Sequence, residues 1–584
     1  MEDDVARYQQ MFLAAEEASQ TARQNAERDR DYYDGKQLTA QERKALADRG
    51  QPPVVVNLIK GVVNYLTGLE KQQRSDPKAY PRNPMSDAEA AEAATDGLRY
   101  VVENANYDVS RSATWRQVLV EGVAGVQVMV VDGRDGPEID IEPVDFDRFF
   151  ADPHSRKIDY SDANYLGLVI WQDLEDAVAQ YGEEYRDSLT DLVKNVSATE
   201  TYDDSPKHTL WADPGRQRVR VVQLWHRKAD GWHFCEFSGS VKLNKGPGAD
   251  LDEDGKSEHP FEFLSAYVDR EHNRYGVVRD IIDSQDEVNK RRSKALHLLT
   301  MRQVSAERGA VADVSDAKRE LAKPDGYIER EPGFAFEVLN TSDLASGQAM
   351  LLQEAKGEIE RMGPSPALQG KADQDQSGRA ILAQQRGGMV ELGGLMDNLR
   401  QFDLRVYRRI WRRIQQSWTA EKWIRVTDDD GAPQFVGMNA QIFDEYGRFL
   451  GIQNPVAEMD VDIIIEDAPD VVTPEGEQFA EFMQLLPLMA QMPPPIVKLA
   501  VEMAPNLTPK RKAKMLEIID QMGGAADPQA QAIQAQQAQM AMQKAQGEIE
   551  NTAADTAKKR ADAVKTATEA ASAGAALMGP TAYA

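Results

Sequence analysis

The segment at residues 32–82 constrains the path of the chain more than any other, because proline and glycine end its helices at defined positions. A charged helix is predicted over residues 40–49, and Pro52-Pro53 prevents it from continuing. The next helix is predicted over residues 58–69, with its apolar residues on one stripe and a glycine near its end. The segment therefore predicts short helices joined by fixed turns, and it contains no catalytic motif.

The pattern of the whole chain predicts an α+β fold that is mainly α-helical. With 584 residues the chain is too long for one core, since single hydrophobic cores stop growing at roughly 250–300 residues. Helical periodicity predicts further helices over residues 3–31, 86–104, 115–125, 171–196, 275–302, 342–362 and 377–419. Alternation of apolar residues predicts strands over residues 126–130, 139–142, 218–226, 232–237, 261–267 and 461–465.

No segment of the sequence predicts a membrane span. The longest apolar run, residues 118–131, is interrupted by Glu121 and Gln127 and is shorter than the roughly 20 residues that a spanning helix needs. The first four residues, Met-Glu-Asp-Asp, lack the basic and apolar regions of a secretory signal. We therefore expect assembly in a cytoplasm.

The cysteine count and the charge exclude several classes of site. Cys235 is the only cysteine, so an intrachain disulfide and a zinc site with several thiolates are excluded, and a small buried hydrophobe is expected. The formal net charge of −28 argues against a surface that grips nucleic acid, because such affinity comes from clustered Lys and Arg. The same charge is compatible with a channel whose weakly repulsive wall lets DNA slide.

Motifs for catalysis and cofactor binding are absent from the sequence. There is no P-loop, since the Gly-Lys-Ala at residues 370–372 lacks the hydroxyl that would bind Mg²⁺. A metal site built from His226, His233 and Cys235 is disfavoured against packing roles on neighbouring strands. We therefore expect no enzyme activity, no metal and no cofactor.

Two kinds of charged segment imitate binding sites. Residues 250–255 place oxygens at alternate positions and glycine at the sixth, as a calcium loop does, but the twelfth position is Phe261 rather than Glu. A solvated hairpin tip is therefore favoured there. Basic clusters at residues 290–294 and 405–413 could contact phosphates, but ion-paired helix faces are favoured in so acidic a chain.

Four segments together resemble the portal proteins of short-tailed bacteriophages. The first is the opening segment, in which Tyr-Tyr-Asp-Gly-Lys-Gln at residues 32–37 precedes a basic helix, a Pro-x-x-x-Asn turn and a helix ending in glycine and arginine. The second, at residues 284–291, carries a Gln and an Asn four apart. Ser-Gly-Arg-Ala-Ile at residues 377–381 and a strand with a Thr turn at residues 460–473 complete the set. Their order matches that family over nearly the whole chain.

The resemblance implies a portal-type fold with a wing, a stem, a clip, a crown and a C-terminal helical barrel. The implied parts are a wing at 1–274, stem helices at 275–302 and 342–362, a clip at 303–341, a tunnel loop at 363–377, a long helix and return to the wing at 378–472, a crown at 473–527 and an Ala/Gln-rich barrel helix at 528–584. A disordered tail is the alternative for the last part. The family also implies a closed head-to-tail ring of about twelve copies around a DNA channel.

The implied function is a head-to-tail connector at one capsid vertex, for genome packaging, DNA retention and ejection. The candidate DNA-channel residues are Gln369, Lys371, Gln374, Gln376 and Arg379. Implied partners are the terminase large subunit as packaging motor, tail adaptor proteins, capsid and scaffolding proteins, and double-stranded DNA, in the virion and, during assembly, in the host cytoplasm. The alternatives are a tail adaptor or scaffold protein and, behind it, a packaging enzyme.

Overall fold

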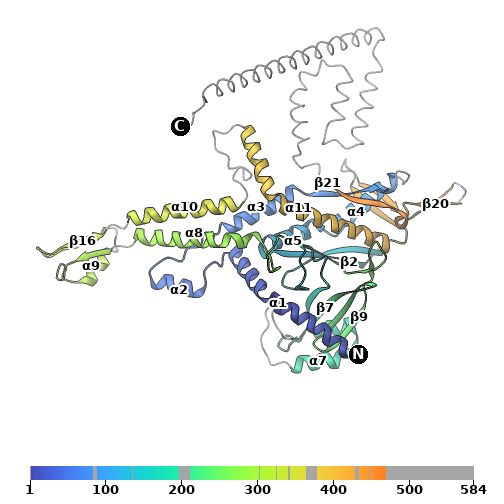
Figure 1. The fold of residues 1–584 in the computed structure, drawn as a ribbon, viewed down its shortest axis with the longest axis horizontal. Helices are drawn as coiled ribbons and strands as arrows, with labels where there is room; N and C mark the ends of the chain where they lie inside the picture. Colours follow the sequence, from blue (N-terminus) through green and yellow to red (C-terminus); the bar gives the residue numbers. More distant parts are fainter. Residues whose placement is uncertain are drawn as a thin grey trace, which may run out of the picture. The chain divides into compact units, whose positions relative to one another are not determined.

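The computed structural model describes most of residues 2–467 (Figure 1). The described ranges are 2–82, 88–134, 136–195, 211–300, 303–321, 325–339, 342–363, 378–427, 433–444 and 448–467, with residues 323 and 446. All of them belong to one compact unit, Met1–Ala468. The predicted crown at 473–527 and barrel helix at 528–584 lie outside the described residues.

Five helices open the chain, and all but the last lie close to their predicted bounds. They are α1 (Glu2–Asp34), α2 (Ala40–Asp48), α3 (Ile59–Gln72), α4 (Ala88–Asn104) and α5 (Tyr107–Glu121). The start of α2 is fixed by a capping box, in which the Thr39 hydroxyl accepts from the Glu42 amide and the Glu42 carboxylate accepts from the Thr39 amide.

Helix α5 differs from its predicted bounds of 115–125. It begins eight residues earlier, at Tyr107, and ends at Glu121 because Gly122 takes a left-handed φ of 97°. Any side chain at Gly122 would meet the backbone of Tyr275, so only glycine permits this close approach. The apolar residues after it belong to a strand.

That strand is the centre of a three-stranded antiparallel sheet, which confirms the predicted hairpin. Its order is β12-β2-β3, with bounds β2 (Val123–Gly133), β3 (Gly136–Val144) and β12 (Phe261–Ser265). Alternate residues of β2 face two different cores. Val126 and Val128 join the large core of α3, α5 and α11 (Gly378–Ser417), whereas Val123 joins aromatic residues of a second sheet.

The second sheet has eight strands in the order β10-β11-β8-β7-β5-β4, with β6 paired to β7 and β9 paired to β8. Their bounds are β4 (Phe149–Ala151), β5 (Tyr165–Asp173), β6 (Ala212–Asp213), β7 (Arg218–Lys228), β8 (Gly231–Ser238), β9 (Val241–Pro247), β10 (Asp250–Leu251) and β11 (Ser257–Glu258). Helix α1 covers one face through Tyr8 and Phe12, and Phe12 packs edge-on against Phe150. Cys235 is fully buried beneath this helix, which confirms its predicted packing role.

The helical insertion predicted over residues 171–196 is wrong at its start. Residues 171–173 end strand β5, and the helices are α6 (Leu174–Tyr181) and α7 (Arg186–Asn195), joined by a 3-10 turn at Glu183–Tyr185. Strand β5 has both faces buried, so its sequence is a continuous apolar run without alternation. Such a run gives no period-two signal, so the sequence does not predict this strand.

A pair of long helices follows the sheets. Helices α8 (Val277–Thr300) and α10 (Ser342–Met362) lie side by side, and their bounds agree with the helices predicted over residues 275–302 and 342–362 (Figure 1). Between them in sequence come a small antiparallel sheet, made of β15 (Gln303–Ala306) and β16 (Phe336–Leu339), and helix α9 (Val314–Leu321). Strands β13 (Tyr267–Val268) and β14 (Arg274–Tyr275) precede α8.

The last described part begins with α11, which is continuous through both of its glycine pairs. The strands after it are β17 (Lys422–Thr427), β18 (Pro433–Met438), β19 (Ala440–Phe443), β20 (Phe449–Gln453) and, after a 3-10 turn at Val456–Glu458, β21 (Val461–Asp467). Strand β21 pairs antiparallel with β1 (Ser75–Pro81), so the end of the described chain returns to its beginning. The described residues form a mixed α and β fold.

Candidate functional site

The opening segment and the Gln-Asn pair of the later motif meet in one place. Gln285 and Asn289 lie one turn apart on α8 and are 0% and 2% exposed. The side chain of Gln285 accepts from the Leu58 amide at 3.0 Å and donates to the Val56 carbonyl at 2.7 Å. Asn289 Oδ1 accepts from the Val56 amide at 2.9 Å. Helix α8 thus binds the extended segment before α3 much as a neighbouring strand would.

A third amide completes this arrangement, which we call the amide joint (Gln37, Gln285 and Asn289). Asn289 Nδ2 donates to Gln37 Oε1 at 2.7 Å, and Gln37 Nε2 donates to the Tyr32 carbonyl at 2.9 Å. Gln285 Nε2 also lies 3.3 Å from Asn289 Oδ1. Because buried amides are costly when unpaired, this closed network fixes one relative position of α1, α8 and the segment before α3.

Other residues of the opening segment strengthen the same contact. The Tyr32 hydroxyl donates to Asp286 at 2.7 Å, and the Ser293 hydroxyl donates to the Pro52 carbonyl at 2.7 Å. Asn57 donates to the Tyr33 carbonyl and accepts from the Lys60 amide in the first turn of α3. The segment predicted as a family fingerprint is therefore a structural joint between the first helices and α8.

Two charged contacts tie α1 to its neighbours on either side of this joint. Arg30 Nη1 lies 2.9 Å from Glu121 Oε1 at the end of α5, and Arg279 Nη2 of α8 lies 3.0 Å from Asp29 Oδ2. Burial raises the pKa of Glu121 to about 7 and the pKa of Asp29 to about 6, and in each case it outweighs the arginine partner. Both carboxyls therefore titrate near neutral pH.

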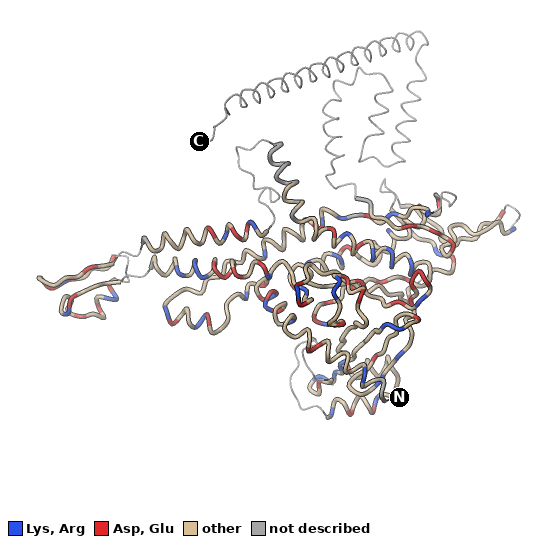
Figure 2. Tube along the Cα trace, in the orientation of Figure 1, with Lys and Arg blue, Asp and Glu red and all other residues tan. Residues whose placement is uncertain are grey.

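The basic cluster at residues 405–413 is an ion-paired helix face, as predicted. Arg405 and Arg409 bind Glu262 of β12 at 3.2 and 2.6 Å. Arg412 and Arg413 both bind Glu258 at 3.1 Å. Figure 2 shows basic and acidic residues interspersed along the described chain rather than gathered by sign.

The segment at residues 250–255 is the tip of a hairpin between β10 and β11, which confirms the interpretation preferred over a calcium loop. Its side-chain oxygens already have partners: Asp252 Oδ1 accepts from the backbone amides of Asp254 and Lys256, and Asp250 pairs with Arg413 at 3.2 Å. Within the described ranges, no group of three or more His, Cys, Asp or Glu side chains is placed to hold a metal ion.

The histidines considered beside Cys235 have structural partners. His226 and His233 face each other across β7 and β8. His226 Nε2 lies 3.3 Å from the Tyr8 hydroxyl of α1, and His233 Nε2 lies 3.0 Å from Asp230. These contacts fix the position of the strands beneath α1 and confirm the packing interpretation.

The basic cluster at residues 290–294 is partly paired along its own helix. Lys290 lies 3.1 Å from Asp286, and Arg291 Nη2 lies 2.8 Å from Glu287, each four residues apart on α8. Arg292 and Lys294 are exposed. The predicted ion-paired face is confirmed for Lys290 and Arg291.

The predicted DNA-channel residues cannot be placed in this arrangement. Gln369, Lys371, Gln374 and Gln376 lie outside the described residues, and Arg379 lies in the first turn of α11, where the side chains are outside the description. Their role stays a prediction. The amide joint was missed as a unit: Gln37, Gln285 and Asn289 each stood in a motif, but nothing in their spacing shows that the two motifs touch.

The sequence matches known proteins over most of its length. The family model for phage P22-like portal proteins matches residues 9–566. A portal protein of Helicobacter pylori bacteriophage KHP30 is 22% identical over 489 residues, which cover 81% of this chain and 75% of that protein. Among the described helices, none is both long and apolar enough to cross a bilayer.

Proposed function

The chain belongs to the phage P22-like portal protein family, and from this premise we propose that it assembles into a closed ring whose channel passes double-stranded DNA. The observation that carries the proposal is the match over residues 9–566, which includes both motifs of the amide joint. The family is structural rather than catalytic. A head-to-tail ring requires two different surfaces of each copy to meet and the rotation to close.

The proposed parts of the ring follow the elements described above. Residues 1–274 would form the wing, α8 and α10 the stem, and residues 303–341, including β15, β16 and α9, the clip. The side-by-side packing of α8 and α10 supports a stem made of two helices. The tunnel loop at 363–377, the return to the wing at 378–472, the crown at 473–527 and the barrel helix at 528–584 complete the proposal.

Exposed apolar residues on the stem support contacts between copies. Leu344 is 62% exposed and Met350 is 75% exposed, although both belong to a helix whose Leu352 and Ile359 are buried in the large core. Exposed large apolar side chains lose contact with water when another surface packs on them, which favours association. In a ring, the adjacent copy would supply that surface.

The channel would bind DNA weakly. A formal charge of −28 on each chain disfavours a basic clamp, and Lys371 and Arg379 would be isolated cations beside Gln369, Gln374 and Gln376. Weak contacts let the duplex slide during packaging and ejection, and DNA retention then depends on how the loops of the ring close around it.

The proposed partners are those of a connector at one capsid vertex. The clip would meet the terminase large subunit during packaging and tail adaptor proteins later, and the wing would meet capsid and scaffolding proteins. A tail adaptor or scaffold protein is the second candidate function, because an Ala/Gln-rich end would suit either. The match over nearly the whole chain favours the portal.

Particle imaging of the purified full chain tests the proposal. We expect rings of about twelve copies of the 65.0 kDa chain, with a central opening in top views. Particles that are monomeric or twofold symmetric at all protein concentrations would contradict the ring. Sustained ATP hydrolysis by the purified chain would instead favour the packaging enzyme.

A further inference from the structure

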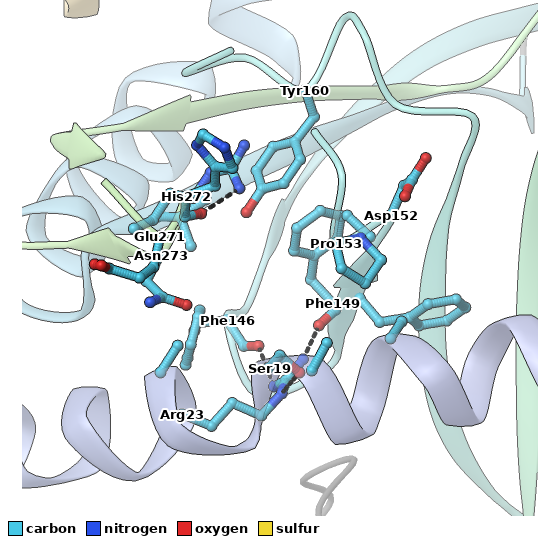
Figure 3. A pocket seen from close by; sticks show the side chains of 17 residues that line it. Ser19, Arg23, Phe146, Phe149, Asp152, Pro153, Tyr160, Glu271, His272 and Asn273 are labelled. Atoms are coloured by element: carbon cyan, nitrogen blue, oxygen red, sulfur yellow. Dashed lines mark hydrogen bonds between the residues drawn. The ribbon is translucent and has the colours of Figure 1, made fainter. Parts of the chain in front are cut away.

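A pocket lies between α1, the segment around β4 and the turn before β14, away from the amide joint (Figure 3). Its cavity volume is about 170 Å³, which is room for several water molecules or a small acid. Two arginines, Arg23 from α1 and Arg274 from β14, line it together with Tyr160. Neither arginine belongs to the charged contacts described above.

Arg23 brings a buried positive charge to the pocket, and the nearby carboxylates of Asp147 and Glu16 attract it from beyond ion-pair distance. It is 4% exposed, and its donors reach the Ser19 hydroxyl at 3.1 Å, the Phe146 carbonyl at 3.2 Å and the Phe149 carbonyl. No carboxylate of the described residues forms an ion pair with it. Burial lowers the pKa of Arg23 to about 10, so the side chain remains charged at neutral pH.

Arg274 is held in the same manner. It is 7% exposed and donates to the His272 carbonyl at 2.7 Å, the Lys157 carbonyl at 2.9 Å and the Ser155 hydroxyl at 3.1 Å. Its guanidinium lies 4.0 Å from the centre of the Tyr160 ring. Its Nε is buried without a hydrogen-bond partner, and among the described residues no carboxylate pairs with it either.

The hydrogen-bond count leaves capacity for a ligand. A guanidinium carries five N–H donors, and three are engaged on each arginine, so two remain on each. Carbonyl and hydroxyl acceptors satisfy donors but do not neutralise charge. Two buried cations beside one cavity therefore favour an anion within it, in addition to the longer-range attraction of Asp147 and Glu16 to Arg23.

The backbone around the pocket is held in an unfavourable conformation at two positions. Tyr160 has φ 57° and His272 has φ 65°, and both residues line the cavity. Residues other than glycine avoid this left-handed region, and such positions gather at ligand sites when they persist. Both residues contact Arg274: the Tyr160 ring lies against its guanidinium, and the His272 carbonyl accepts a hydrogen bond from it.

The rest of the lining defines the shape of a ligand. Phe146, Phe149 and Phe150 form an apolar wall, and small alanines of α1 leave space opposite. Of the two carboxylates that line the pocket, Asp152 accepts from the His154 and Asn164 amides, whereas Glu271 is exposed.

We propose that this pocket binds a small organic oxyanion, with its carboxylate or phosphate group between Arg23 and Arg274 and its apolar body against the phenylalanine wall. The lining residues come from α1, the segment around β4 and the turn before β14. A bound anion would link α1 to β4 and β14.

Calorimetric titration of the full-length protein tests the site, with benzoate and phenyl phosphate as probes and chloride at equal ionic strength as reference. We expect one site per chain with a Kd of about 1 mM or tighter for at least one probe. The two probes distinguish carboxylate from phosphate recognition. Absence of saturable binding for both would overturn the proposal.

Variants that fill the pocket test the site while both buried arginines stay in place, so the protein is not destabilised by the loss of their hydrogen bonds. Ala18 and Ala22 line the pocket, so Ala22→Leu, or the double variant with Ala18→Leu, adds bulk inside it while favouring the helix. We expect at least about tenfold weaker binding, since the ligand and the new side chain compete for one cavity. Ala14→Leu on the same helix lies outside the lining and should bind as the wild type does. Equal affinity of the Ala22→Leu and Ala14→Leu proteins would overturn the proposal.

Discussion

At the scale of single residues, Asn289 shows how one side chain can join distant parts of the chain. Its amide contacts the backbone of Val56 and the side chain of Gln37, which are more than 230 residues away in sequence. A Leu or Val at this position would fill similar space but satisfy neither group. The need for Asn follows from the buried donors and acceptors that surround it.

Asn289→Ala should therefore destabilise the protein. The change leaves the Val56 amide and the Gln37 amide group buried without their partners, which costs about 1–3 kcal/mol. We expect this loss of stability to appear as a lower urea concentration at the unfolding midpoint, measured at constant protein concentration. Asn104→Ala serves as the control, because Asn104 is exposed and its bond to Glu138 lies at the surface. A control variant that loses as much stability would contradict a special role for Asn289.

The raised pKa of Glu121 predicts that the stability of the folded protein depends on pH. This pKa rises from the ordinary 4.5 to about 7, mainly because of burial. Between these values the folded protein binds more protons than the unfolded chain, so the stability that Glu121 contributes below pH 4.5 is lost as pH rises through 7. Asp29, whose pKa is raised to about 6, acts in the same direction.

Glu121→Gln should make stability less sensitive to pH between about 4.5 and 7. The neutral amide still accepts from Arg30 but cannot ionise, so we expect the loss across this window to shrink by about 1–3 kcal/mol. Thermal unfolding measured across the pH range tests this. Glu103→Gln, at an exposed position of α4, should reproduce the wild-type profile. If the Glu121 variant also follows that profile, the buried carboxyl is not the titrating group.

At the scale of elements, one buried ion network holds three helices together. Arg111 of α5 binds Asp403 of α11 at 2.8 Å and also pairs with Glu70 of α3. The Tyr107 hydroxyl donates to the same Asp403 at 2.9 Å. All of these side chains are buried, and the one cation among them faces two carboxylates, while Arg74 Nε lies 3.9 Å from Glu70 Oε1 as a second, partly exposed cation.

Arg111→Met should be among the most destabilising single changes in the described part of the chain. It leaves Asp403 without its cation and Glu70 with only Arg74 at 3.9 Å, which costs about 3–5 kcal/mol. A triple variant that adds Glu70→Gln and Asp403→Asn removes those charges and should recover part of the loss. Guanidinium unfolding of both proteins provides the measurement. A triple variant no more stable than the single one would show that geometry, rather than unpaired charge, sets the cost.

The elements also show what the sequence could predict. Amphipathic helices and solvent-facing strands carry a period, so α1, α8, α10 and the β2–β3 hairpin were predicted close to their bounds. Strand β5 carries none, because both of its faces are buried. The amide joint and the arginine pocket depend on contacts between distant segments, which spacing within one segment cannot reveal.

At the scale of the whole molecule, α8 and α10 differ in their contacts with the rest of the chain. Buried amides and ion networks fix α8 to the first helices inside one copy. Helix α10 contacts α8 with one face and carries exposed apolar residues elsewhere. This division suits the proposed ring, in which each copy would be rigid within itself and would associate with its neighbours through α10.

Replacing Leu344 and Met350 together by Glu should therefore prevent ring assembly while the single chain stays folded. Both side chains are exposed, so the change costs little within one copy, but in a ring it would place paired charges in every contact between stems. We expect sedimentation near the 65.0 kDa of one chain and a wild-type circular dichroism spectrum. Gln353→Glu adds charge at an exposed position of the same helix and should leave rings intact. If the double variant forms rings of unchanged size, the contact between copies does not involve Leu344 and Met350 and lies on another surface.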